Sequence, residues 1–447
     1  MEYLKEIAKF AKSFSLSQVP DEAIDKSKLL ILDSLSAMVA GNQNREIGKL
    51  MKRISDSYPI EHENSTVPVL GLSEQLDFRM AALVNGIGMV SDELDEGNPL
   101  AKGHPAAHFF PALLSLSFEH CTPGVKMLEA FHISYEISAR MGSVIQLKQP
   151  IHPHGNWGVF GNGFGIGKLL GWERGSDFIH AAMLATSFAM PTLWQSVLEG
   201  HKVRNVIIGL NNYHTTLLAD LVEAGFSASL STAEIVYKDI LADSNNGFPD
   251  DLYDTHYLMK SYFKFYPYCR FCHSPVDAAV DLIKTGELKK IKEIKVKTYS
   301  SAAKLKAKTV PNTFAGKFSI PFSIASELYE THCQDSSFQI NREEVIQFLM
   351  NRVTVFELED YTELLPKKRV TTVMVEFMDG TMREKTVDRA TGDPEEPCLK
   401  AKVLDKSRTL LRSHFGEKQS DDIIETILEL EKQADITQLK EMLTVKT

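Results

Sequence analysis

The sequence predicts a mainly α-helical protein, with a large all-helical domain and a smaller α/β (α+β) domain. Three observations support this fold class. Apolar residues repeat with helical spacing over the first ~260 residues. Apolar and charged residues then alternate in short stretches, as they do in strands, and helical spacing returns from Pro397. We therefore expect a discontinuous helical domain of residues 1–262 and 397–447, and a second domain of residues 263–396.

The helical domain contains segments with clear helix signals. Pro20 and Asp21 favour a helix start, because proline suits the first turn and an acid suits the positive end of the helix dipole. Gly41 favours the end of that helix. The run 181–189 is apolar nearly all round, which is typical of a helix buried inside a bundle. Further helices are predicted over 78–90, 110–119, 125–141, 158–170, 177–190 and 216–223.

The second domain shows strand patterns. Residues 291–299 alternate apolar and charged positions, which indicates a half-buried strand. Asp379-Gly380 between two alternating runs predicts a tight hairpin turn. The remaining elements expected here and beyond are the hairpin strands 370–377 and 381–387, and helices over 275–285, 318–330, 399–415 and 421–433.

Composition limits the classes of function. Of 447 residues, 43% are hydrophobic and 24% charged, as in a folded protein long enough for two domains. The net charge of −10, without any basic tract, argues against nucleic acid or a membrane surface as a partner. The first residues follow helical spacing rather than a signal-peptide pattern, and no apolar run has the ~18 residues of a membrane span. We expect a cytoplasmic protein.

The cysteines indicate reduced thiols. Five residues, an odd number, are scattered along the chain, which does not fit a disulfide framework. They are Cys121, Cys269, Cys272, Cys333 and Cys398.

An acidic turn follows the predicted helix 78–90. Glu93 and Asp95 lie in a run of four carboxylates, and Lys102 and His104 follow within a few residues. Such a run is often a solvated loop, but its glycines and proline indicate an ordered turn, and the helices on both sides are of the buried type. Closely spaced acids there can raise the pKa of a carboxyl toward neutral pH. A divalent cation site is the competing use of these oxygens.

A second motif contains His152 and His154, in the stretch His-Pro-His-Gly before a helix. These imidazoles could be metal ligands, a base with a substrate binder, or structural turn residues. A turn at a helix entrance also directs backbone N–H groups toward one point, which suits an anion. The run Gly161 to Gly167 lacks a preceding strand and the third glycine of a dinucleotide fingerprint, so we interpret it as a helix packed closely against a neighbour.

Two basic regions are candidates for binding a carboxylate. Lys264, Arg270 and His273 lie in an aromatic-rich stretch at the predicted domain border. The pattern C-x-x-C-H at 269–273 formally matches a haem or redox motif, but the partners that those sites need are not nearby. Arg204 lies in a further basic patch, for which a surface loop is the alternative.

The order and spacing of these motifs resemble the MmgE/PrpD family over nearly the whole chain. The resemblance rests on the acidic turn with Gly103-His104-Pro105, on His152-Pro153 before a Trp-Gly segment, and on Cys269 to His273. It is reinforced by Pro311 to Ser323 and by Gly392-Asp393-Pro394.

This resemblance implies a large helical domain with a smaller α/β lid domain, a homodimer, and no metal or other cofactor. It implies that Glu93, His104, His152 and His273 are catalytic. Substrate binding would then fall to Asp95, Lys102, His154, Arg204, Lys264 and Arg270. The substrate would be a small di- or tricarboxylate anion.

Two departures from the decarboxylase pattern of the family bear on the reaction. Gly97 stands where that pattern has a threonine, and His201 to Asn205 replaces an expected Lys-x-x-His-x-Gly signature. Both features are more similar to the iminodisuccinate epimerase branch. The resemblance therefore implies an epimerase, with a 2-methylcitrate dehydratase-like or cis-aconitate decarboxylase-like lyase as the alternative.

The residues suggest one proton-transfer mechanism for epimerisation and for elimination. His104 or His152 would remove a proton from the carbon next to a carboxylate, and His273 or Glu93 would return one. Arg204, Lys264 and Arg270 would stabilise the charge that develops on the carboxylate oxygens. A catalytically silent polycarboxylate-binding protein is the non-enzymatic alternative, and an iron–sulfur hydro-lyase is a second enzymatic one.

Overall fold

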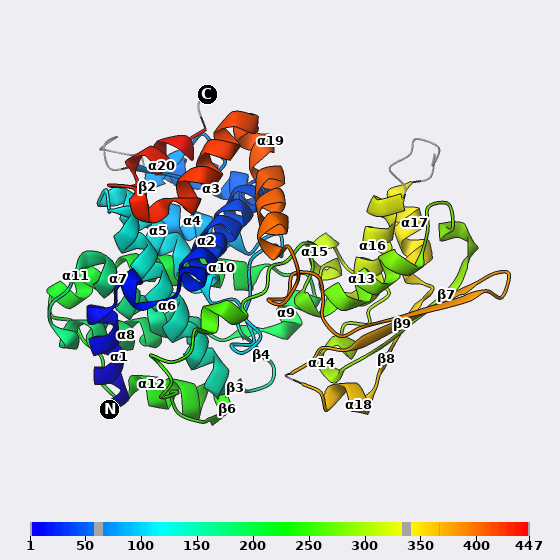
Figure 1. The fold of residues 1–447 in the computed structure, drawn as a ribbon, viewed down its shortest axis with the longest axis horizontal. Coiled ribbons are helices and arrows are strands. Elements are labelled where there is room, and N and C mark those ends of the chain that lie inside the picture. Colours follow the sequence, from blue (N-terminus) through cyan, green and yellow to red (C-terminus); the bar gives the residue numbers. More distant parts are fainter. Residues whose placement is uncertain (1, 58–65, 333–340, 366, 446–447) are drawn as a thin grey trace. The chain divides into compact units, whose positions relative to one another are not determined.

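The structure is a computed structural model that describes residues 2–57, 66–332, 341–365 and 367–445 (Figure 1). The chain forms two compact units. The first unit comprises Met1–Trp194, Val203–Phe263 and Pro397–Thr447, and the second comprises Gln195–Lys202 and Lys264–Glu396. Residues 195–202, which the sequence analysis includes in the helical domain, group with the second unit. Cys333 lies outside the described residues.

Helices form most of the first unit, and the prediction of a mainly α-helical protein is confirmed. Among its described residues, the longer helices are α1 (Glu2–Ser13), α2 (Asp21–Gly41), α3 (Arg45–Ser57), α4 (Phe78–Met89), α5 (Phe110–Glu119), α6 (Gly124–Val144), α7 (Asn162–Leu170), α8 (Gly175–Ser187), α10 (Val203–Thr216) and α19 (Leu399–Leu428). Shorter ones are α9 (Trp194–Leu198), which continues into the second unit, α11 (Leu218–Glu223), α12 (Thr232–Glu234) and α20 (Thr437–Met442). Single turns and a π-helix are η1 (Leu16–Gln18), η3 (Ala106–His108), η4 (Trp157–Gly161), η5 (Ile235–Ile240), η6 (Tyr257–Lys260) and η9 (Leu430–Lys432).

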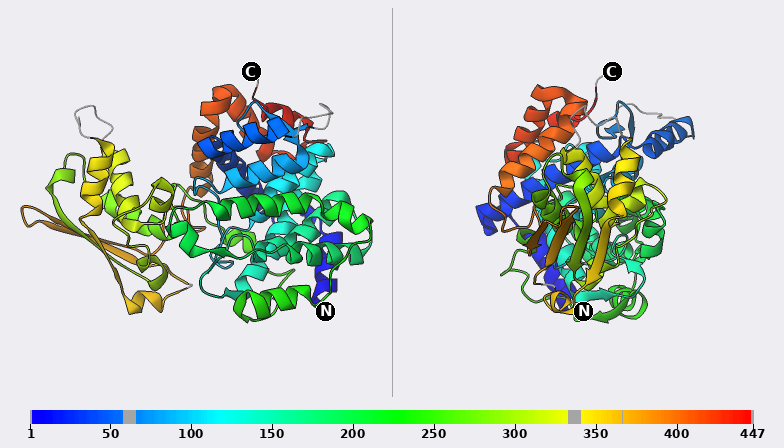
Figure 2. Two further views of the ribbon diagram at one scale, coloured as in Figure 1. Left: turned by 180° about the vertical axis from the view of Figure 1, so that it is seen from behind. Right: turned by 90° about the vertical axis from the view of Figure 1, so that its right-hand side faces the viewer.

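The core of the first unit is built on α2. Its apolar run makes it buried over nearly its whole length, as the sequence predicts for a helix apolar all round. Helix α4 packs against α2 and α10, and the C-terminal α19 also packs against α2. Figures 1 and 2 show α19, at the end of the sequence, beside α2, near its beginning.

Short ladders complete the first unit. β1 (Thr66–Pro68) pairs with β2 (Gln75–Asp77), and β3 (Ile145–Leu147) pairs with β6 (Ala242–Asn245). β4 (Ile151–His152) pairs with β5 (Thr192–Leu193), and His152 lies opposite Thr192. The sequence analysis did not predict these ladders. The last one fixes the backbone of the His-Pro-His-Gly motif.

The second unit contains a four-stranded sheet in the order β10-β9-β7-β8. The predicted strand 291–299 and hairpin are found as β7 (Ile291–Thr298), β9 (Thr371–Phe377) and β10 (Met382–Val387). Strand β8 (Val353–Glu357), which was not predicted, runs parallel to β7. The other elements are η7 (Arg270–Cys272), α13 (His273–Leu282), η8 (Leu288–Lys290), α14 (Ser300–Ala303), α15 (Thr313–Gly316), α16 (Ile320–His332), α17 (Arg342–Met350) and α18 (Glu359–Thr362). Helices α13 and α16 contact strands of the sheet and each other (Figure 2).

Helices α10 and α19 differ from what the sequence predicts. The basic patch around Arg204 is the beginning of α10, and Arg204 is buried, so the surface-loop alternative is wrong for this residue. The two predicted C-terminal helices are parts of α19, which is interrupted at Gly416 by a backbone φ of 73°. Among the described residues, no helix is both long and apolar enough to cross a membrane.

Candidate active site

The acidic turn leaves the end of α4 and is buried. Glu93, Asp95 and Glu96 are each at most 2% exposed. Glu93 and Lys102 both have left-handed backbones, with φ of 58° and 59°, a conformation that costs an ordinary residue about 1–2 kcal/mol. Two short backbone pairs, Gly97 with Tyr262 and Asn98 with Gly103, close the turn. The segment is therefore an ordered structure rather than a solvated acidic loop.

His104 is oriented by this turn. Its Nδ1 lies 3.1 Å from Oδ2 of Asp95 and also forms a short hydrogen bond with the carbonyl oxygen of Glu96. Both of these groups are acceptors, so Nδ1 carries the proton and the lone pair of the neutral ring is on Nε2. The His104 side chain is 12% exposed, whereas the Asp95 side chain is fully buried. This arrangement is that of a histidine base held in one tautomer by a carboxylate.

His154 has the opposite tautomer. Nη1 of Arg204 donates to Nδ1 of His154 over 2.9 Å, so the imidazole proton is on Nε2. Nη2 of Arg204 makes a short ion pair with Glu93. Burial, and then the charge of Arg204, hold the pKa of His154 well below its usual value. His154 is therefore a neutral ring whose Nε2–H can donate, and no hydrogen-bond partner of Nε2 is found among the described residues.

His152 and His108 support the two rings. The backbone N–H of His154 donates to Nδ1 of His152 over 3.2 Å, and the His152 ring lies 4.3 Å from that of Trp194. Nδ1–H of His108 donates to the carbonyl oxygen of His104 over 3.0 Å, and Nε2 of His108 accepts the N–H of Gly155 over 3.0 Å. Burial lowers the pKa of His108 to about 4. His108 thus joins the segment of His104 to that of His154.

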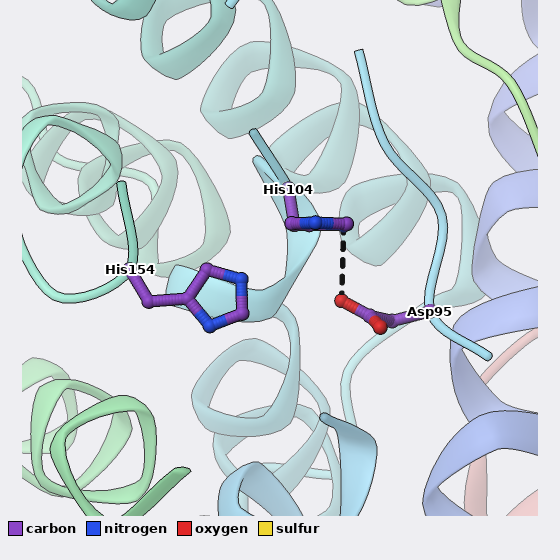
Figure 3. Close-up of side chains that lie close together, drawn as sticks. All are labelled: Asp95, His104 and His154. Carbon is purple, nitrogen blue, oxygen red and sulfur yellow. Dashed lines mark ion pairs between the residues drawn. The ribbon is translucent and has the colours of Figure 1, made fainter. Parts of the chain in front are cut away.

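Figure 3 shows Asp95 and His154 approaching from opposite sides, with His104 between them. The rings of His104 and His154 are 4.9 Å apart and nearly perpendicular. Asp95, His104 and His154 each offer an atom within 4.8 Å of the others, as a metal site would. However, the lone pair of His154 is on Nδ1, where it accepts from Arg204, so Nε2 is a hydrogen-bond donor. This chemistry fits an anionic ligand better than a cation.

A second group of this spacing, among the described residues, is His132, Glu136 and His256. The carboxylate of Glu136 already pairs with Arg140 and accepts two backbone N–H groups, from Tyr257 and Leu258. Because the nearby guanidinium neutralises this carboxylate and would repel a cation, the group does not suit a metal ion.

Glu96 is a buried carboxyl behind the base. Its Oε1 accepts the N–H of Ala106 over 2.9 Å, and its Oε2 is 2.6 Å from the hydroxyl of Tyr135. Burial, with a smaller effect of Asp95, raises the pKa of Glu96 to about 8. A carboxyl of the acidic turn with a pKa raised toward neutral pH was predicted from the sequence. Neighbouring acids were expected to be the cause, but desolvation is the larger one.

Lys102 is not brought to this cluster. Its ammonium donates to the carbonyl oxygens of Ile145, over 2.8 Å, and Ser143, over 3.4 Å. Burial lowers the pKa of Lys102. Its contacts hold the end of α6 against the turn, which is a structural role.

Three predicted site residues belong to the second unit. Lys264 is fully buried. Arg270 donates to the carbonyl oxygens of Ala390 and Thr391 and pairs with Asp393 over 2.6 Å. These contacts hold the Gly-Asp-Pro segment of the same unit.

The ring of His273 has a hydrogen bond at each nitrogen. Nδ1 accepts from Nη1 of Arg270 over 3.1 Å, and Nε2–H donates to the carbonyl oxygen of Tyr268 over 3.1 Å. Returning a proton to a substrate would require one of these bonds to break. Cys269 and Cys272, which precede His273 in the same motif, are both buried.

Sequence reasoning missed His108, Glu96 and Tyr262 as parts of this site. His108 lies four residues after His104, and an H-x-x-x-H spacing was a usable signal. Glu96 was one of four acids in the turn, and only the fold shows that burial raises its pKa. Tyr262 contacts the turn through its backbone pair with Gly97, a residue far from it in sequence.

The chain is similar to known proteins over nearly its whole length. The profile of the MmgE/PrpD N-terminal domain matches residues 5–237, and that of the MmgE/PrpD C-terminal domain matches residues 266–432. A cis-aconitate decarboxylase of Aspergillus terreus (strain NIH 2624 / FGSC A1156) is 24% identical, over 98% of this chain and 95% of the relative. Another cis-aconitate decarboxylase of Aspergillus terreus is 24% identical with the same coverage.

Proposed function

Because the chain belongs to the MmgE/PrpD family, we propose that it is an enzyme that moves a proton at the carbon next to a carboxylate of a small di- or tricarboxylate. The observation that carries this proposal is the pair formed by His104 and the buried Asp95, with the imidazole ring of His154 beside it. The family assignment gives the class of protein, and this geometry supports the proposed chemistry.

His104 is the base in this proposal. Asp95 and the Glu96 carbonyl hold its proton on Nδ1, so Nε2 accepts the proton of the substrate. The Asp95 carboxylate then stabilises the imidazolium that forms, as a buried acid does next to a catalytic histidine. His152 is a weaker candidate, because its Nδ1 accepts the N–H of His154 and its proton is therefore on Nε2.

His154 binds the charge that develops on the substrate. A neutral imidazole is a good hydrogen-bond donor to an enediolate, because its N–H stabilises the negative charge on the oxygen while the proton stays on the ring. Arg204 keeps that donor in place and adds positive charge behind it, while Glu93 fixes Arg204. In this proposal Glu93 positions the binding group and does not return the proton.

A lyase is the reaction that these roles favour. One imidazole that takes a proton from the carbon can deliver it to a departing hydroxyl, so a single base is sufficient for a dehydration. In a decarboxylation the carbanion left by CO₂ takes up a proton, so the same imidazole would have to donate it as imidazolium. The two relatives named cis-aconitate decarboxylase support this reaction class. An iminodisuccinate-type epimerase is the second candidate. It needs a second proton carrier on the other face of the carbon.

Proton exchange in D₂O tests the proposal. The protein is incubated with succinate derivatives and with cis-aconitate and 2-methylcitrate, and NMR follows deuterium uptake, loss of water and loss of CO₂. His104→Ala should reduce every one of these rates by about 100-fold or more while the circular dichroism spectrum is unchanged. His120→Ala, at an exposed helix end, is the control and should keep full activity.

Different outcomes lead to different conclusions. Deuterium at the α carbon with inversion and no elimination would favour the epimerase. Normal turnover by the His104→Ala variant would rule out the proposed base. Binding of the acids without exchange or turnover would favour a silent binding protein. The homodimer also stays a proposal, and sedimentation equilibrium tests it.

A further inference from the structure

We infer that Tyr262 limits the size of the substrate, so that the site accepts a four-carbon dicarboxylate and discriminates against a tricarboxylate. This inference rests on the proposed function and specifies its substrate class. It starts from the contact between Tyr262 and Gly97, which the proposed proton transfer does not use.

The phenol of Tyr262 occupies the space of a side chain at position 97. A Cβ on Gly97 would lie 2.3 Å from the hydroxyl oxygen of Tyr262 and 2.4 Å from its Cζ. Both distances are far below van der Waals contact. Only glycine at position 97 is therefore compatible with this position of the ring. Tyr262 as a whole is 3% exposed.

This filled space lies next to the proposed base. Gly97 directly follows Glu96, whose carbonyl oxygen is hydrogen-bonded to Nδ1 of His104. The rings of Tyr262 and His104 lie 6.5 Å apart at an angle of 84°, edge to face. A group on the substrate carbon that approaches His104 from this side meets the phenol.

The backbone of Tyr262 is held on both sides. Its N–H donates to the carbonyl oxygen of Gly97 over 2.8 Å, and its carbonyl oxygen accepts the N–H of Gly97 over 3.1 Å. The preceding Ser261 is held by Lys26, which donates to its carbonyl oxygen over 2.7 Å, and its Oγ lies 2.6 Å from the hydroxyl of Tyr135. The segment cannot move away to admit a larger ligand without breaking these bonds.

The size of the acid follows from this geometry. A tricarboxylate has one more carboxylate arm than a dicarboxylate, and in this inference the ring of Tyr262, held beside the base, occupies the space that this arm would need. A pocket of fixed shape discriminates by about tenfold or more against one additional group that it cannot hold. The chain would then differ in substrate from the two relatives, whose names state a tricarboxylate. The size limit would also disfavour the epimerase candidate, because iminodisuccinate carries four carboxylates.

The test measures binding of two probes, succinate and citrate, by calorimetry in the full-length protein. The wild type should bind succinate more tightly than citrate. Tyr262→Ala should shift this ratio toward citrate by about tenfold or more. Tyr262→Phe, which keeps the ring and removes only the hydroxyl, is the control and should leave the ratio within about threefold of wild type.

Position 97 provides a second, coupled test. Gly97→Ala should weaken succinate binding by displacing the phenol, and the Gly97→Ala/Tyr262→Ala double variant should recover a substantial part of the loss. Melting temperatures of all variants report whether they are folded. An unchanged succinate-to-citrate ratio in folded Tyr262→Ala, strictly additive effects in the double variant, or a wild type that binds neither acid would each overturn the inference.

The two proposals fail in different experiments. Absence of proton exchange and turnover in a wild type that prefers succinate would end the proposed function and leave the size limit standing. Turnover that depends on His104, together with an unchanged ratio in Tyr262→Ala, would end the size limit and leave the function standing.

Discussion

Asp95 is buried against Nδ1 of His104. The effect of its charge on turnover can be measured by a substitution that changes little else. Asp95→Asn keeps the size of the side chain and removes the charge that would stabilise the His104 imidazolium in the proposed mechanism. We expect the turnover rate to fall by about 100-fold. Asp92→Asn, in the same turn but partly exposed, is the matched control and should stay near wild type. Equal losses in both variants would show a general effect of charge on the turn.

Another single residue, Glu96, makes the free energy of unfolding depend on pH. Its pKa is raised from 4.5 to about 8 by burial, so the folded protein keeps this proton while the unfolded chain loses it. The stabilising effect of the proton is complete below about pH 4.5 and is lost as the pH rises toward 8. Within this window, the free energy of unfolding of wild type relative to Glu96→Gln should fall by up to about 1.4 kcal/mol per pH unit. Urea unfolding between pH 5 and 8 measures the difference, and a constant difference would contradict the assignment.

Single residues also show how far the sequence could predict the site. Glu93, His104, His154 and Arg204 were predicted as site residues, and the fold brings them together because each lies at the end of a buried helix or in a loop beside one. Their roles could not be predicted, because the tautomer of an imidazole depends on contacts far apart in sequence. The contact between Arg204 and His154, which makes the ring a donor, joins residues 50 positions apart.

At the scale of elements, α7 depends on close approach to its neighbours. A Cβ on Gly163 would lie 2.2 Å from the backbone nitrogen of Ala182 in α8, and one on Gly165 would lie 1.7 Å from Oγ of Ser134 in α6. The sequence analysis interpreted this glycine run as a helix packed closely against a neighbour, and the structure confirms it. The glycines therefore serve packing rather than nucleotide binding.

This packing leads to a prediction about two glycines in helices. Gly163→Ala should lower the free energy of unfolding by about 1–3 kcal/mol, because backbone atoms cannot yield to the new methyl group. Gly48→Ala in α3 meets no atom within 4 Å. It should raise the free energy of unfolding by about 0.5–1 kcal/mol through helix propensity. Urea unfolding followed by circular dichroism measures both, and a stable Gly163→Ala variant would contradict the packing argument.

Element types were predictable where periodicity was long. The predicted helix 110–119 coincides with α5, and the Asp-Gly turn correctly placed the hairpin of β9 and β10. Strand β8 was missed because it is short and only half buried, so its alternation is weak. Helix α10 was missed altogether, because its basic, polar first turn resembles a loop until its burial is known.

At the scale of the whole molecule, the last segment of the chain completes the first unit. Lys406 of α19 pairs with Asp33 of α2 over 2.6 Å and donates to the carbonyl oxygen of Leu94 over 2.6 Å. Its side chain is only 7% exposed. The acidic turn is therefore held by a residue more than 300 positions further along the chain.

Removing this contact should affect both stability and catalysis. Lys406→Met should lower the free energy of unfolding by about 3 kcal/mol, since it breaks a buried pair, and should reduce turnover by loosening the turn. Lys400→Met removes an exposed pair with Asp25 from the same helix, and its effect should stay within about 1 kcal/mol. Thermal unfolding and kinetics on the two variants compare them directly, and similar losses in both would refute a special role of Lys406.

The same connectivity affects synthesis of the protein on the ribosome. The residues that form the acidic turn emerge early, but the lysine that ties the turn to α2 emerges only after the whole second unit has been translated. Until then neither Asp33 nor the carbonyl oxygen of Leu94 can contact Lys406, so the acidic turn gains these contacts only when translation is nearly finished.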